Sequence, residues 1–222
     1  MMKEKKTSFR LLRYCYGIKT NCIQAGVFLL TGVLLMALGD KNGELMGCYF
    51  WVTIGLLPAQ LISSLSVSKM VQSSPMKKKI QTIIPVAVSL GCVLLIYLLE
   101  SLVYGIRLLN GSGQEAEISG FLLAVAIMTA LMLTYVGVAL KHFVVSTLLF
   151  ISDVMYLYLM MGKREACLMK VLNSMDMPFG LAVLAGLGII LAGGLAQYLL
   201  TLLFYKAPLD RMGQPAFLRR EL

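Results

Sequence analysis

The sequence predicts an all-α integral membrane protein with six transmembrane helices, both termini in the cytoplasm and an N-terminal amphipathic helix at the membrane interface. Three observations lead to this fold class. The chain of 222 residues is 59% hydrophobic and only 14% charged, with a mean hydropathy of +0.82. Its apolar runs reach about 20 residues, which at roughly 1.5 Å per residue crosses the hydrocarbon core. Basic residues concentrate in alternate links, which sets a membrane orientation.

Residues 1–20 form the first expected element, a cytoplasmic helix lying flat in the headgroup region. The segment carries six basic residues. Its apolar side chains fall mostly on one helical face, and they are Phe9, Leu11, Leu12, Cys15, Tyr16 and Ile18. A basic amphipathic helix of this kind binds the membrane surface. The alternative, a disordered basic leader, applies best to the first six residues.

A transmembrane domain is expected over residues 21–205, followed by a cytoplasmic basic tail over 206–222. The six expected spans are 21–39, 45–68, 80–104, 118–140, 143–161 and 179–205. The small residues around Leu38 also resemble a signal-peptide cleavage site. The long charged region in front and the full spanning length of the first run favour a retained helix instead.

The second and third spans contain aromatic, proline and acidic residues whose positions in the membrane can be predicted. In 45–68, Tyr49, Phe50 and Trp51 are expected at the outer interface, where aromatic belts form. Pro58 lies in the middle of this run and is expected to bend it. In 80–104, Pro85 comes near the start, and Glu100 in the final turns is expected to reach the outer headgroups. Each of the two prolines is either a point at which its helix bends during function or a static kink.

Short links complete the chain order. Residues 40–44 and 110–117 are expected as polar outer links, and Lys141–His142 as a tight inner turn. Residues 163–177 mix charged and apolar side chains, so we expect them on the outer interface and not across the membrane. In this topology 15 of the 20 basic residues are inside, so the plasma membrane with both termini cytoplasmic is the predicted location.

The segment between the second and third spans is short, basic and marked by serine and proline. Its lysines are Lys69, Lys77, Lys78 and Lys79. Ser73-Ser74-Pro75 predicts a turn followed by a new helix, with Ser74 as a possible cap and Pro75 in the first turn. A structured loop of this kind, continuing through Met76, suggests that a partner docks there. The alternative is that the lysines only fix the orientation.

Two features inside the spans are candidate functional residues. Asp153 lies near the middle of the fifth span, where an uncompensated charge costs about 2.5–3.5 kcal/mol. It faces either a substrate path or proton relay, or a neighbouring helix to which it is hydrogen-bonded. Gly188, Ala192 and Ala196 recur at four-residue spacing in the last span. Such spacing favours close helix packing, either between subunits or within the bundle.

Several functions find no support in the sequence. It contains no phosphate-binding GxxxxGK[ST], HExxH or GxSxG motif, so we expect no catalytic site and no cofactor in this chain. The five cysteines are scattered and there is one histidine, so no metal site is expected either. The net charge of +9 is explained by the lipid bilayer surface, without nucleic acid.

The layout resembles the permease subunits of type-2 ABC exporters. The residues that carry the resemblance are Ser73, Ser74, Pro75, Met76, Lys77, Lys78 and Lys79. They look like the family's polar loop between helices two and three, whose coupling helix docks on an ATPase subunit. The resemblance implies that the ATPase subunit, with its ATP and magnesium, contacts residues 67–81. It also implies a second permease copy or a paralogue.

The function implied is outward movement of a peptide, drug-like or lipid substrate by alternating access. The compact chain, without a large outer domain, argues against a bulky polysaccharide. Two alternatives remain from other classes. One is the substrate-binding membrane subunit of an importer, for which the first span lacks the small-residue motifs expected. The other is a non-transporting membrane immunity or assembly protein, which needs no ATPase.

Overall fold

The structure, a computed structural model, describes residues 18–38, 41–65, 73, 75–111, 114–139, 142–161 and 167–206. Every regular element in these ranges is a helix, which confirms the all-α class. The helices are α2 (Ile18–Leu38), α3 (Lys41–Leu65), α5 (Lys77–Gln81), α6 (Ile83–Leu109), α7 (Glu115–Val138), α8 (Phe143–Met161), α9 (Cys167–Ser174) and α10 (Phe179–Leu203). Most of the expected interfacial helix and of the tail lies outside the described residues.

Among the described residues, five helices are long and apolar enough to cross a membrane. Their spanning parts are Ile18–Ala37, Asn42–Ile62, Lys77–Leu109, Glu115–Val138 and Phe179–Leu203. The chain is therefore a multi-pass membrane protein. The apolar part of α8, Val144–Met160, is shorter and lies near the lower limit of about 17 residues for a span. The sixth span stays a prediction.

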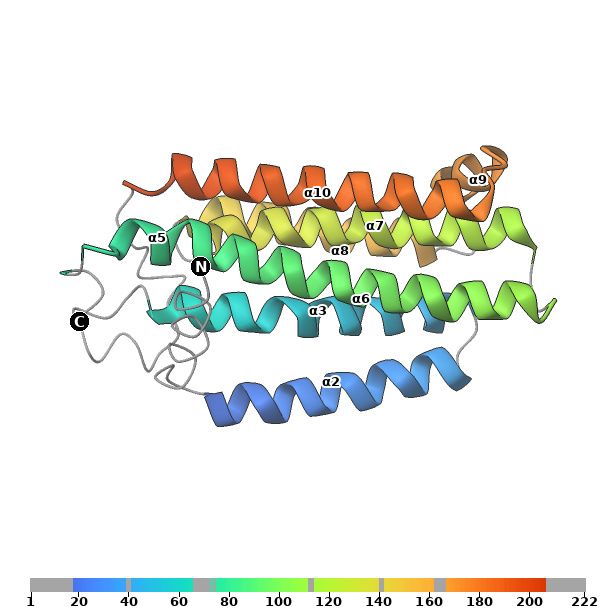
Figure 1. The fold of residues 1–222 in the computed structure, drawn as a ribbon, viewed down its shortest axis with the longest axis horizontal. Helices are drawn as coiled ribbons and strands as arrows, with labels where there is room; N and C mark the ends of the chain where they lie inside the picture. The colour runs from blue at the N-terminus through green and yellow to red at the C-terminus, as the bar shows by residue number, and fades with distance from the viewer. Residues whose placement is uncertain are drawn as a thin grey trace.

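The long helices run side by side along the longest axis of the molecule, and the two short ones lie at opposite ends (Figure 1). The short helix α5 lies at the end where α2 begins and α10 finishes, and α9 lies at the other. This arrangement agrees with the expected order of inner and outer links. We refer to the end with α5 as the α5 end and to the other as the α9 end; which of them faces the cytoplasm stays a prediction.

Helix α7 is the centre of the bundle. Most of its side chains are buried, since α10, α8, α9, α3 and α6 all pack around it. A helix that is apolar all round suits such a position. Helix α2, by contrast, packs mainly against α3 and leaves apolar side chains such as Ile23 and Leu30 exposed. In a membrane protein this outer face is available to lipid.

Aromatic side chains fill the contact between α2 and α3. Trp51 packs directly over Gly32, and the rings of Phe28 and Phe50 are 5.3 Å apart. The indole nitrogen of Trp51 is buried, and no described residue offers it a hydrogen-bond partner. The expectation that Trp51 belongs to an interfacial belt is therefore wrong, because α3 begins at Lys41 and places this residue well inside the helix.

Both links at the α9 end are shorter than expected because acidic residues begin helices there. Glu44 lies in the first turn of α3, and Glu115 and Glu117 lie in the first turn of α7. Negative side chains stabilise a helix N-terminus. Glu115 also accepts a hydrogen bond of 2.8 Å from the backbone N–H of Phe179, so it ties the start of α10 to the start of α7.

Small residues allow α10 to pack closely, but on a different face from the one singled out in the sequence. The buried ones are Ala182, Gly186, Gly193 and Gly194. Gly188 and Ala192 are exposed and Ala196 is half-buried; a side chain added at Gly188 would meet nothing within 4 Å. The prediction that Gly188 and Ala192 pack within the bundle is therefore wrong. A role for them between subunits stays a prediction.

A buried hydrogen bond joins α6 to α10. The Ser89 hydroxyl lies 3.0 Å from the Gln197 side-chain oxygen, and both residues are buried. We expect Ser89→Ala to lower the free energy of unfolding by about 0.6 kcal/mol, a typical value for such bonds between membrane helices. Denaturant titration in detergent micelles would measure it. Ser152→Ala is the control, because that exposed hydroxyl bonds only within α8, and an equal effect would contradict the prediction.

Candidate functional site

The basic segment contains the short helix α5, which follows a turn. The turn covers Pro75 and Met76, and Met76 is the residue immediately before the helix. A new helix start is confirmed at this position. Pro75 precedes the helix, so its expected place in the first turn is wrong. Ser74, the residue expected to cap the new helix, lies outside the described residues.

Helix α5 is fixed to the bundle through one face. Ile80 and Gln81 are buried, with 5% and 6% of their surfaces exposed, and the helix packs against α6 and α3. Lys78 and Lys79 are exposed and Lys77 is half-buried. The apolar contact of Ile80 holds the helix in place, so the positive side chains are presented at the α5 end of the bundle.

The change of direction between α5 and α6 occurs at Thr82. Its backbone has φ −120° and ψ −64°, and its hydroxyl donates a 2.7 Å hydrogen bond to the Lys78 carbonyl. Pro85 lies in the first turn of α6, and its ring and missing N–H act on the carbonyl four residues earlier, at the end of α5. It therefore accounts for the break at Thr82, and whether this bend moves stays a prediction. Pro58 does lie inside α3, as expected.

Asp153 faces the interior of the bundle. Only 2% of its surface is exposed, and one carboxyl oxygen is buried with no hydrogen-bond partner in the described part of the chain. It interacts electrostatically with Tyr49 of α3 and with Tyr156 of its own helix. The Tyr156 hydroxyl already donates a 3.0 Å hydrogen bond to the Ala124 carbonyl of α7. The inward position agrees with the sequence expectation, and its role stays a prediction.

Glu100 is the functional candidate that sequence reasoning missed. It was expected in the outer headgroups, but its surface is 0% exposed and it lies between α6 and α3. Neither carboxyl oxygen has an oxygen or nitrogen hydrogen-bond partner among the described residues. The Cys48 thiol of α3 lies beside it and interacts with it. The expectation failed because α6 continues to Leu109, which leaves Glu100 nine residues inside the helix.

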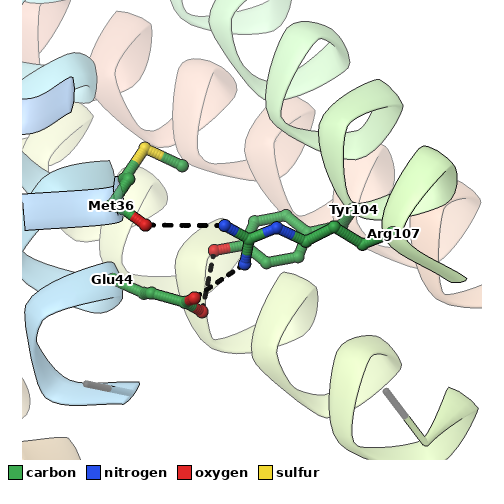
Figure 2. A network of polar contacts seen from close by, with 4 residues as sticks. All are labelled: Met36, Glu44, Tyr104 and Arg107. Atoms are coloured by element: carbon green, nitrogen blue, oxygen red, sulfur yellow. Dashed lines mark hydrogen bonds and ion pairs between the residues drawn. The ribbon is translucent and has the colours of Figure 1, made fainter. Parts of the chain in front are cut away.

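A charged network lies nearer the α9 end of the same contact, and Figure 2 shows its four residues. Arg107 forms an ion pair of 2.6 Å with Glu44 and reaches the Met36 carbonyl at 3.5 Å. The Tyr104 hydroxyl lies 3.4 Å from the other Glu44 oxygen. The Arg107 guanidinium also lies 5.2 Å from the centre of the Tyr104 ring. Tyr104 thus links the Arg107–Glu44 ion pair to the interior of the bundle.

These groups form one connected set, which we name the α3–α6 polar cluster: Glu44, Cys48, Glu100, Tyr104 and Arg107. The Cys48 thiol interacts with both Glu100 and Tyr104, and Tyr104 contacts Glu44. One sequence signal could have found the buried part. Tyr97, Glu100 and Tyr104 recur at spacings of three and four, which places them on one face of a helix.

The α3–α6 polar cluster and Asp153 lie at one level on two sides of α3. Cys48 lies beside Glu100, and the next residue, Tyr49, is near enough to Asp153 to interact with it electrostatically. Within the described ranges, no three His, Cys, Asp or Glu side chains are grouped so that they could hold a metal ion. The arrangement therefore places buried polar side chains and an ion pair inside the bundle, and positive charge at its α5 end.

Comparison of the chain with protein-family models, with curated proteins and with solved structures finds no match.

Proposed function

We propose that this multi-pass protein is the membrane-spanning permease subunit of an ABC exporter, and that α5 is the contact for a separate ATPase subunit. The observation that carries the proposal is the geometry of α5. Ile80 and Gln81 are buried and α5 packs against α6 and α3, while Lys78 and Lys79 remain exposed. A docking element needs this combination, because it must present charge to a partner and also transmit movement.

The proposed mechanism is alternating access driven from outside the chain. ATP and magnesium bind to the partner, and closure of the ATPase pushes on α5. Since α5 packs against both α6 and α3, a displacement of α5 is passed to both helices. Pro58 lies two turns before the end of α3, where a bend changes the angle of its last turns. A second copy or a paralogue completes the path for a peptide, drug-like or lipid substrate.

The importer subunit and the immunity or assembly protein remain the alternatives. An importer subunit would also bind an ATPase, but substrate would accumulate inside the cell. An immunity or assembly protein would retain its activity without any ATPase.

The experiment that tests the proposal is co-purification of the tagged chain from its native membrane, with an ABC ATPase sought in the captured material. We expect Lys77→Glu, Lys78→Glu and Lys79→Glu together to reduce capture by at least about tenfold, because like charges across an interface cost several kcal/mol. Lys19→Glu with Lys206→Glu is the control, since both lysines are exposed, Lys19 in the first turn of α2 and Lys206 three residues after α10. The start of α2 and the end of α10 both lie at the α5 end (Figure 1).

Two outcomes would contradict the proposal. The first is capture that both sets of charge reversals reduce equally, which would indicate a general charge effect. The second is modification of Lys78→Cys by an impermeant thiol reagent added outside intact cells, above the level of the parent chain. That result would place α5 on the side of the membrane where no ATPase is present.

A further inference from the structure

Glu100 is a carboxyl group held inside the bundle, with the Cys48 thiol beside it and no oxygen or nitrogen donor of the described residues within hydrogen-bond range. It lies about 13 Å along the axis from the end of α6, at 1.5 Å per residue. An ionised carboxylate at this site would be shielded from solvent and without a counter-charge among the described residues, which is unfavourable by several kcal/mol. Arg107 is engaged with Glu44 and does not serve as that counter-charge. The favoured form of Glu100 is therefore the neutral acid.

The groups around Glu100 suit a proton better than a metal ion. From α3 it meets the Cys48 thiol, and from α6 it interacts with Tyr97, whose hydroxyl is also buried without a partner. On the other sides α7 contributes the Phe121 ring against Tyr104, and α10 contributes Gly186 against Tyr97. Calcium takes six to eight oxygen ligands, and the groups described here provide far fewer.

We propose that Glu100 is a reversible proton-binding site of the bundle, reached from the α9 end through Glu44, Tyr104 and Cys48. The proton enters at Glu44, which is part-exposed beside Arg107 (Figure 2). Tyr104 and Cys48 each give up one proton as they receive one, so neither changes its net charge. The Glu100 carboxylate gains one proton and becomes the acid. The proposal for this site does not depend on the binding of an ATPase to α5.

The site can be tested with dicyclohexylcarbodiimide, an apolar reagent that modifies protonated carboxyls within membranes. In the purified full chain in lipid nanodiscs, peptide mapping is expected to show the modification at Glu100, decreasing as the pH is raised. Glu100→Gln removes it. Asp153→Asn is the matched control, since it removes another buried carboxyl and leaves modification of Glu100 unchanged. An unmodified Glu100, or modification independent of pH, would overturn the proposal.

The route is tested by infrared spectroscopy of the protonated carboxyl after transfer into heavy water. In the Asp153→Asn background the band lost in Glu100→Gln reports Glu100 alone. We expect Tyr104→Phe to slow its hydrogen–deuterium exchange by about tenfold, the kinetic equivalent of one lost hydrogen bond. Tyr156→Phe, which removes a buried hydroxyl beside Asp153, is the control. Equal exchange in Tyr104→Phe and its parent would show that protons reach Glu100 another way.

Discussion

Gly193→Ala is expected to lower the free energy of unfolding by about 1–3 kcal/mol, the usual cost of overpacking a well-filled interior. A methyl group at Gly193 would lie 2.7 Å from the Cα of Ala130, so it would collide with the backbone of α7. Backbone cannot rotate away as a flexible side chain can, and α10 and α7 must therefore separate. Denaturant titration in micelles would measure the effect.

Gly188→Ala on the same helix is the matched control. No atom lies within 4 Å of the added methyl group, and alanine is a better helix former than glycine. The variant is therefore expected to be as stable as the parent chain or slightly more stable. Equal destabilisation by the two substitutions would contradict the assigned orientation of α10. A loss of dimer with unchanged monomer stability in Gly188→Ala would support the predicted seam between subunits.

Arg107→Leu is expected to lower the free energy of unfolding by about 1–2 kcal/mol, because it leaves the Glu44 carboxylate without its partner. The pair joins the last turn of α6 to the first turn of α3, with 35% of the Arg107 side chain and 23% of the Glu44 side chain exposed. This exposure keeps the effect well below that of a fully buried pair. Denaturant titration in micelles would also measure this effect.

A double-mutant cycle separates the ion pair from other losses. Glu44→Gln removes the charge and keeps the shape, so the double variant Glu44→Gln with Arg107→Leu is expected to be more stable than the sum of the single effects predicts. Strictly additive effects would show that the 2.6 Å contact contributes nothing to stability. In that case Arg107 would act mainly by its stacking over Tyr104.

Most of the spanning helices could be predicted from the sequence, because bilayer thickness sets their length and apolar composition sets their position. The uncharged run around Pro58 became α3, and the run after the lysines became α6. The helix ends were less predictable. Residues 41–44 and 115–117 looked like polar links, but acidic side chains are favourable in the first turn of a helix and were included in α3 and α7.

The candidate site was predictable only in part. The basic segment and Asp153 stand out because charge is rare in this chain. Glu100 was assigned to the headgroups because its depth depends on where α6 ends, and that end is decided by the turn at Gly111, with φ +69°. The α3–α6 polar cluster needed a second helix to bring Glu44 and Cys48 to Arg107 and Glu100.

The sequence by itself determined that this is a helical membrane protein, roughly where its helices lie, and that a basic segment separates two of them. The tertiary structure alone decided which face of each helix is buried. The physical reason is that a membrane helix can pack one face against protein and another against lipid, and both surroundings favour apolar side chains. Helices α7 and α10 are therefore apolar on all sides. Composition cannot distinguish these surroundings, so only the packed helices show that Gly193 is enclosed and Gly188 is exposed.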